Sequence, residues 1–160
     1  MNSGEVKPES AYAGVEEVSA EAFITARSVV YPWQCDHMGH MNVMWYTEKF
    51  DEATWQLMGQ IGITPSYLRN NRRGVAAVQQ ETTYKHELFA GDLILIRSGI
   101  LEMREKVIRF YHEMLNTETQ DIVAATTLTG VHLDSETRKS CPFPTDIVER
   151  GRRFILQGGK

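Results

Sequence analysis

The sequence predicts an α+β domain in which one long helix packs against a single antiparallel sheet of about five strands. A strand pattern comes first, one long helical pattern follows over residues 43–58, and the chain from residue 74 onward is almost entirely strand-like. Helices and strands that are segregated along the chain in this way indicate an α+β architecture. With 160 residues, the chain fits one domain of ordinary size and is too short for two.

Composition and charge argue against several classes of protein. Lys and Arg number 17 against 21 Asp and Glu, a net charge of −4, whereas nucleic-acid-binding domains carry clustered basic charge. Two cysteines are too few for a multi-bridge secreted scaffold or a four-cysteine zinc site. No run approaches the roughly 18 consecutive apolar residues of a membrane-spanning helix. We therefore expect a cytoplasmic protein that binds neither nucleic acid nor a membrane.

The chain is expected to begin with a disordered acidic tail over residues 1–20. Residues 1–21 contain five glutamates and one lysine, so they lack the basic and then apolar pattern of a signal peptide. From Phe23 the run FITARSVVY is rich in β-branched residues and predicts the first strand. The domain itself is expected to span residues 21–140.

The long helix follows a loop that contains Pro32 and Gly39. Its apolar face is predicted from residues that recur three and four positions apart: Val43, Tyr46, Thr47, Phe50, Ala53, Thr54, Leu57 and Met58. Asn42 stands directly before the helix and is a good N-cap, and Gly59 and Gly62 end it. A second short segment, helical or irregular, begins at Thr64-Pro65.

Four strands are then expected to pair in antiparallel succession. Their sequences are VAAVQQETTYKHEL, LILIRSGILEM, KVIRFYHEML and DIVAATTLTGVHL. A five-stranded sheet curls, so the helix would fill its concave face. The outer face and the edges then need a partner, which predicts a homodimer or a homotetramer. Residues 141–160 form a C-terminal extension with a possible short helix near residues 145–152.

The loop from Cys35 to Asn42 carries the candidate chemistry. It places Asp36 six positions before the helix N-cap, with Gly39 between them to let the loop fold back. The first backbone N–H groups of the helix, starting at Val43, have no intrahelical acceptor and lie at the positive end of the helix dipole. Acyl transfer needs such donors for an oxyanion, together with a carboxylate that acts as nucleophile or as general base on water. The same field keeps Asp36 ionised at neutral pH.

Other interpretations of these residues remain open. Asp36 is also consistent with a loop carboxylate that binds backbone N–H groups, and His40 with a structural hydrogen-bonding residue. Asn42 is first of all an N-cap, worth about 1 kcal/mol. Asp36, His37 and His40 resemble a metal cluster, but no further ligand type lies near them in the sequence, so we expect neither a metal nor another cofactor.

Over residues 22–140 the chain resembles the 4-hydroxybenzoyl-CoA thioesterase-like branch of the hotdog-fold superfamily. That branch has an Asp-x-x-Gly-His-x-Asn loop before its central helix, which this sequence matches from Asp36 to Asn42. Other positions that fit are Tyr46, Phe50, Glu52, Tyr84 and the Gly91-Asp92 turn. The resemblance implies a hotdog fold, a symmetric dimer or dimer of dimers, and hydrolysis of an acyl-CoA thioester.

The resemblance also implies roles for the residues of the loop. Asp36 would be the catalytic carboxylate, and the Val43 N–H would polarise the thioester carbonyl. His40 and Asn42 would position the substrate, the water or the loop itself. In related enzymes, basic residues after the third strand bind the nucleotide end of CoA near the subunit interface. Arg104 and Lys106 match those positions, whereas the residue between them is acidic.

Aromatic residues near the loop are candidates for binding the acyl group. Trp33, Trp45 and Tyr46 are expected in the core or an interface by default. Trp33 and Trp45 flank the loop, so they are also consistent with a pocket for a flat ring or a cage for a cationic acyl group. The main alternative function is a non-catalytic acyl-CoA binding module. A hydratase or dehydratase would need a His–Asp or His–Glu pair placed differently, and the sequence offers none.

Overall fold

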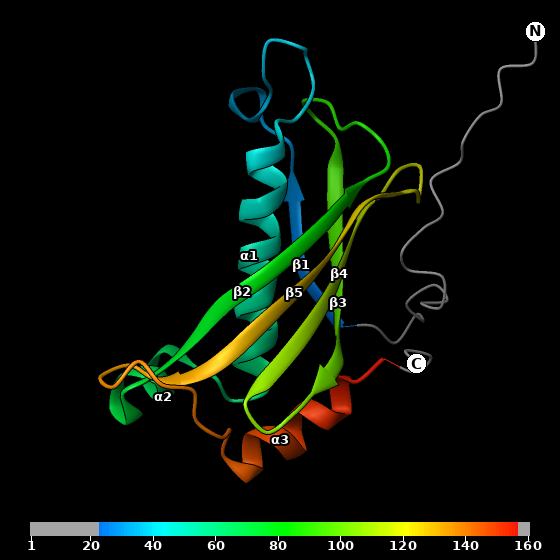
Figure 1. Ribbon diagram of the computed structural model, residues 1–160. Helices are drawn as coiled ribbons and strands as arrows, with labels where there is room; N and C mark the ends of the chain where they lie inside the picture. The colour runs from blue at the N-terminus through cyan, green and yellow to red at the C-terminus, as the bar shows by residue number, and fades with distance from the viewer. Residues whose placement is uncertain (1–22, 157–160) are drawn as a thin grey trace, which may run out of the picture.

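A curled antiparallel sheet wraps around one long helix in the computed structural model, which describes residues 23–156 (Figure 1). The predicted α+β hotdog architecture is therefore confirmed, while the predicted acidic tail lies outside the described residues. The elements are β1 (Phe23–Val29), α1 (Val43–Gln60), α2 (Pro65–Asn71), β2 (Arg73–Tyr84), β3 (Leu93–Met103), β4 (Val107–Asn116), β5 (Ile122–Asp134) and α3 (Thr145–Gly151). Among these helices, none is long and apolar enough to cross a membrane.

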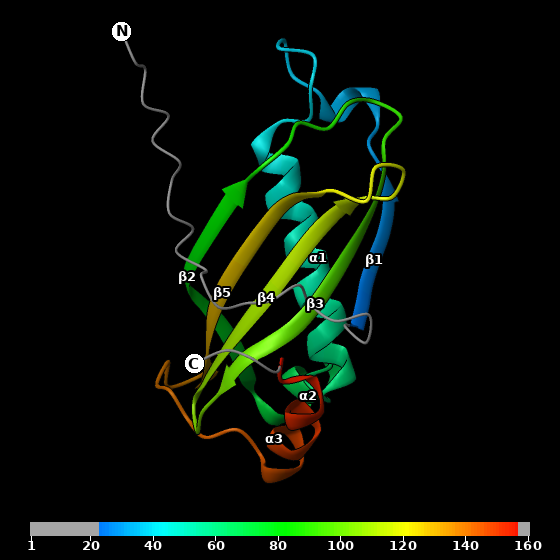
Figure 2. The ribbon, with the colours of Figure 1, turned by 90° about the vertical axis from the view of Figure 1, so that its right-hand side faces the viewer.

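The strand order in the sheet is β1-β3-β4-β5-β2 (Figure 2). The expected antiparallel succession is wrong at its first step, because β2 pairs with β5 and not with β3. The connection over residues 85–92 is therefore a crossover instead of a hairpin. It is tied to both sides of the sheet, since the N–H of Lys85 donates to Val123 O (2.8 Å) and that of Gly91 donates to Val30 O (2.8 Å). The crossover leaves β1 and β2 as the two edges.

The buried face of α1 follows the predicted stripe from Tyr46 to Met58. The buried residues of that stripe are Tyr46, Phe50, Ala53, Thr54, Leu57 and Met58. Val43 and Thr47 were predicted on the same face but are exposed, because Val43 begins the helix at the loop and Thr47 lines an open cleft. Lys49 is buried although its charge predicts exposure, and its Nζ donates to Ser28 Oγ at 2.9 Å.

The segment after residue 140 packs onto the far end of the core. Phe143 and Ile147 join the cluster formed by the last turn of α1 and the ends of β3 and β4. Arg150 Nε donates to Ile61 O at 2.8 Å, which satisfies a carbonyl at the C-terminus of α1. The short helix expected in the C-terminal extension is present as α3, and it packs against the core.

A buried polar chain crosses the core from β1 to α1 through His112. The Thr54 hydroxyl donates to Phe50 O (2.9 Å), so its oxygen accepts from His112 Nε2 (3.0 Å). His112 Nδ1 then accepts from Ser98 Oγ (2.6 Å), and Ser98 Oγ forms a second hydrogen bond with Thr25 Oγ1 (2.6 Å). Every polar atom of the ring is thus satisfied without a charge. Burial lowers the pKa of His112 from 6.5 to about 3.

The buried His112 predicts acid sensitivity of the fold. Between pH 6.5 and about 3, the unfolded chain binds a proton at residue 112 that the folded protein excludes. The free energy of unfolding therefore decreases as pH falls, by at most about 1.4 kcal/mol per pH unit from this group. Urea unfolding at several pH values should give a shallower dependence for His112→Gln. The exposed His86, changed to Gln, should keep the wild-type dependence. Equal pH dependence in wild type and His112→Gln would contradict the assignment.

Candidate active site

The loop between β1 and α1 folds back on itself as the sequence predicts. Cys35 and Met41 form an antiparallel bridge, and between them the Asp36 N–H donates to His40 O at 3.1 Å. The Gly39 N–H donates to Asp36 O at 3.0 Å. This tight return requires a φ of +85° at Gly39, which glycine adopts without steric cost. The loop therefore has a defined shape before any ligand binds.

Two further backbone hydrogen bonds hold this loop against its neighbours. The Met41 N–H donates to Leu88 O (2.7 Å) in the β2–β3 crossover, and the Asn42 N–H donates to Gln34 O (2.9 Å). Met41 and Leu88 are both buried, and so is Gln34, whose side chain accepts from the Tyr31 N–H at 2.9 Å. The loop is thus fixed by buried anchors on both sides.

Asp36 lies in this loop with both carboxylate oxygens engaged. Oδ2 accepts from Asn42 Nδ2 at 3.0 Å, and Oδ1 accepts from the Met38 N–H at 2.8 Å. The Asn42 hydrogen bond lowers the pKa of Asp36 most, the Met38 N–H lowers it next, and partial burial opposes both. Asp36 is therefore an anion at neutral pH, in a partly exposed position.

Asn42 connects that carboxylate to the helix. It is the N-cap of α1, with φ −70° and ψ 144°, and its Oδ1 accepts from the Met44 N–H at 3.1 Å. The N–H of Val43 precedes the first intrahelical bond, and we find no acceptor for it within residues 23–156. The free Val43 N–H thus lies at the positive end of the α1 dipole, next to Asn42, which binds Asp36.

His40 faces a carboxylate that sequence reasoning missed. Its Nε2 lies 3.5 Å from Glu87 Oε1, with the His40 side chain 28% exposed and the Glu87 side chain 63% exposed. Glu87 belongs to the crossover and is far from His40 in the sequence, so no short spacing pattern predicts this His–Glu pair. The predicted hairpin between β2 and β3 gave no reason to bring them together.

The aromatic candidates divide into surface and core. Trp33 is 67% exposed in the single chain, so of its two default placements only an interface remains, and its ring stacks on Tyr31 at 4.3 Å with an interplanar angle of 6°. Trp45 is half-buried against the core. Tyr46 is buried and meets Tyr84 edge to face at 5.2 Å, and burial raises its pKa to about 12. Tyr46 therefore supports α1 from within.

The predicted CoA-binding residues lie elsewhere in the chain. Arg104 and Lys106 belong to the β3–β4 turn, at the end of the sheet that carries α3 and away from the Asp36 loop (Figure 2). Arg104 Nε pairs with Glu102 Oε1 at 2.7 Å, and Glu105 O accepts from the Phe143 N–H at 2.8 Å. Within one chain these basic residues do not reach Asp36.

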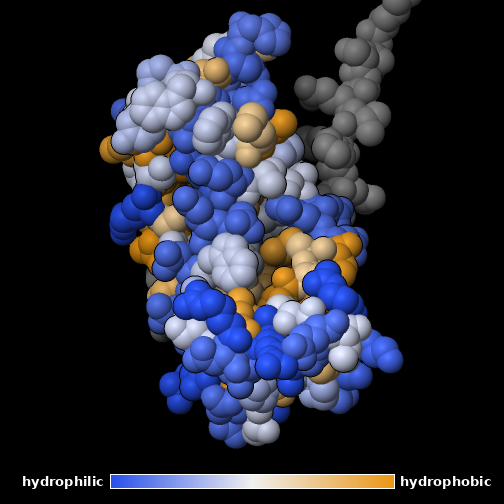
Figure 3. Space-filling model, turned by 90° about the vertical axis from the view of Figure 1, so that its left-hand side faces the viewer, coloured by the Kyte–Doolittle hydropathy of each residue, from blue (hydrophilic) through white to orange (hydrophobic). Residues whose placement is uncertain are grey.

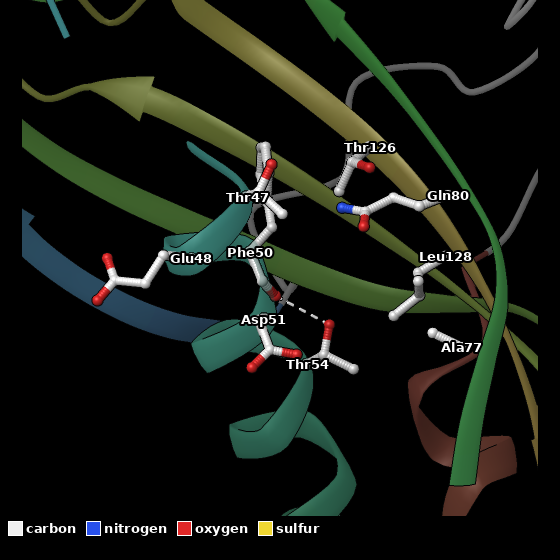
Figure 4. A pocket seen from close by; sticks show the side chains of 9 residues that line it. All are labelled: Thr47, Glu48, Phe50, Asp51, Thr54, Ala77, Gln80, Thr126 and Leu128. Atoms are coloured by element: carbon white, nitrogen blue, oxygen red, sulfur yellow. Dashed lines mark hydrogen bonds between the residues drawn. The ribbon is translucent and has the colours of Figure 1, made fainter. Parts of the chain in front are cut away.

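An open cleft of about 180 Å³ separates α1 from β2 and β5 (Figure 4). Its lining residues are Thr47, Glu48, Phe50, Asp51, Thr54, Ala77, Gln80, Thr126 and Leu128. The floor is apolar or hydroxylated, while Glu48 and Asp51 lie at the α1 rim, with the Glu48 carboxylate turned away from β2 (Figure 4). Figure 3 shows this side of the molecule, where apolar surface interrupts the hydrophilic residues.

The described residues contain no group of three or more His, Cys, Asp or Glu side chains that is placed to hold a metal ion. The candidate site consists of Asp36, Asn42, His40, Glu87 and the start of α1.

Comparison with known proteins gives one family and one fold. Residues 30–151 match the model of the thioesterase-like superfamily. A betainyl-CoA thioesterase of Pseudomonas aeruginosa is 21% identical over 131 residues, 82% of either chain. An L-carnitine dehydrogenase/betainyl-CoA thioesterase of Rhizobium meliloti is 25% identical over 117 residues, which cover 72% of this chain but only 23% of the relative's length.

Among solved structures, a Staphylococcus aureus protein in complex with CoA has a TM-score of 0.77 and 17% identity to this chain. The match covers 83% of this chain and 84% of the S. aureus chain, and it shows that the two share a fold.

The two contacts of Asn42 can be separated experimentally. In Asn42→Ser, a side-chain oxygen still caps α1, but the short hydroxyl cannot replace the amide donor to Asp36. We expect the pKa of Asp36, followed by carboxyl ¹³C NMR, to rise toward its ordinary value with little loss of stability. Asn42→Ala should raise the same pKa and also lower the free energy of unfolding by about 1 kcal/mol. An unchanged Asp36 titration in both variants would contradict the coupling.

Proposed function

The chain belongs to the thioesterase-like superfamily, and we propose from this that it hydrolyses an acyl-CoA thioester to a free acid and CoA. The observation that carries the proposal is the amide of Asn42, which holds the ionised Asp36 at the N-terminus of α1. This arrangement brings together a carboxylate and an unused backbone donor, the two groups that acyl transfer needs.

In the proposed reaction, the thioester carbonyl oxygen accepts a hydrogen bond from the Val43 N–H. Negative charge grows on that oxygen as the carbonyl carbon becomes tetrahedral, so a donor at the positive end of a helix stabilises the transition state more than the substrate. Asp36 either attacks the carbonyl carbon to form a mixed anhydride, which water then hydrolyses, or takes a proton from the attacking water. Both routes need Asp36 as an anion, and its lowered pKa provides that state.

For the acyl group, we favour a small cationic one. The relatives named betainyl-CoA thioesterases suggest a quaternary ammonium group as the first to test. Faces of aromatic rings attract such cations, and the exposed stacked pair of Tyr31 and Trp33 lies a few residues before Asp36. The cleft beside α1 has an acidic rim, which also favours a cation over a fatty acyl chain.

A second copy of the chain is part of this proposal. β2 is a sheet edge of twelve residues whose middle is exposed, and such edges pair readily with another strand. Pairing of β2 with its symmetry mate would cover the cleft and bring the two chains into a homodimer, or into half of a homotetramer. The CoA phosphates would then bind Arg104 and Lys106 of one chain while the thioester lies at Asp36 of the other.

The decisive experiment is release of free CoA from four acyl-CoAs: short aliphatic, long aliphatic, aromatic and betainyl. Wild type should turn over the betainyl substrate fastest, and Asp36→Asn should reduce kcat by at least about a hundredfold with the fold intact. Asp121→Asn serves as a matched control, since it removes an exposed carboxylate of the β4–β5 turn that lines neither the loop nor the cleft. Near-wild-type turnover by Asp36→Asn would refute the assignment. Saturable CoA binding without turnover would favour a non-catalytic binding module.

Removal of the Arg104 and Lys106 charges tests the phosphate site separately. The double Ala variant should raise KM severalfold with little change in kcat, because the phosphates are remote from the reacting carbonyl. Arg69 and Lys139, two exposed basic residues without ion pairs among the described residues, provide the matched control pair. An unchanged KM in the Arg104/Lys106 variant would exclude both residues from the site.

A further inference from the structure

We propose that Glu87 is a positioning residue for His40, and that the two form a carboxylate–imidazole pair in which His40 protonates the leaving CoA sulfur. This inference rests on the proposed function and adds a residue from a second loop to the site. The motif in the β1–α1 loop does not contain it, and only the crossover from β2 to β3 places it there.

The pair is held by the backbone on both sides. The residues that follow the two partners, Met41 and Leu88, share the 2.7 Å backbone hydrogen bond between the loops. Leu88 is fully buried and Met41 is 2% exposed, so this bond is anchored in the core. The backbones that carry His40 and Glu87 are therefore held side by side, and their side chains approach to 3.5 Å across this junction.

Stability alone gives little reason for the contact. Exposed ion pairs contribute a median of about 0–1 kcal/mol, and the Glu87 side chain is largely exposed. At 3.5 Å the two atoms are also slightly farther apart than in an ordinary hydrogen bond. Catalytic contacts are often long in the free enzyme and shorten when substrate binds, so this separation is compatible with a catalytic pair.

The chemistry of the leaving group gives the pair a role. Carboxylate oxygens only accept, so in this pair the hydrogen on His40 Nε2 faces Glu87 and the hydrogen on Nδ1 remains for the substrate. When the C–S bond breaks, its electron pair stays on sulfur, and Nδ1 of the His40 imidazolium donates its proton to give the CoA thiol and a neutral imidazole that keeps its hydrogen on Nε2. Solvent restores the proton to His40. The Glu87 carboxylate orients the ring and offsets its positive charge before the transfer, as the third group of a catalytic triad does.

A double-mutant cycle tests this role. Glu87→Gln keeps the shape of the side chain but removes its charge, and should lower kcat about tenfold or more with KM unchanged. His40→Gln should lower kcat further, and adding Glu87→Gln to it should have no additional effect, because Glu87 acts only through His40. Glu149→Gln, on α3 at the far end of the molecule, is the matched control. Multiplying effects, or an unchanged kcat in Glu87→Gln, would overturn the inference.

A spectroscopic measurement separates this inference from the proposed function. In long-range ¹H–¹⁵N spectra, Glu87→Gln should shift the imidazole signals of His40 and leave those of the buried His112 and His132 in place. This readout needs no substrate, so it remains valid if wild type hydrolyses none of the acyl-CoAs and the proposed function fails. If turnover is present but the His40 signals do not respond, the pairing of Glu87 with His40 is refuted alone.

Discussion

At the start of α1, the two ends of one amide group serve two different structures. The Asn42 side-chain oxygen caps the N-terminus of α1 by accepting the Met44 N–H. The side-chain nitrogen orients Asp36 and lowers the pKa of that carboxylate. Helix, loop and charge therefore depend on the same side chain.

The local parts of this arrangement were predictable from sequence, and the non-local parts were not. Spacing predicted α1, the N-cap at Asn42 and the folded loop around Gly39, because each depends on residues a few positions apart. Glu87 and the exposure of Trp33 depend on where the crossover runs and on what covers a loop. Neither feature can be predicted from a few consecutive residues of the sequence. The burial of Lys49 on α1 depends likewise on Ser28 in β1.

The two ends of the sheet have different characters. At the end that carries the candidate chemistry, backbone hydrogen bonds tie the β1–α1 loop to the β2–β3 crossover. The opposite end is closed by α3 and carries the basic β3–β4 turn. In the proposed function, acyl-CoA would contact both kinds of end. In the proposed dimer, each copy would supply the end that the other lacks.

The polar chain through His112 also makes the core observable. His112 is fully buried, and its Nε2 hydrogen points at Thr54 on α1. Such a hydrogen exchanges with solvent only when α1 separates from the sheet, so its exchange rate measures how often that separation occurs. Because α1 also carries the candidate site at its N-terminus, the exchange of this one imidazole proton would report how often the helix that holds the site separates from the sheet.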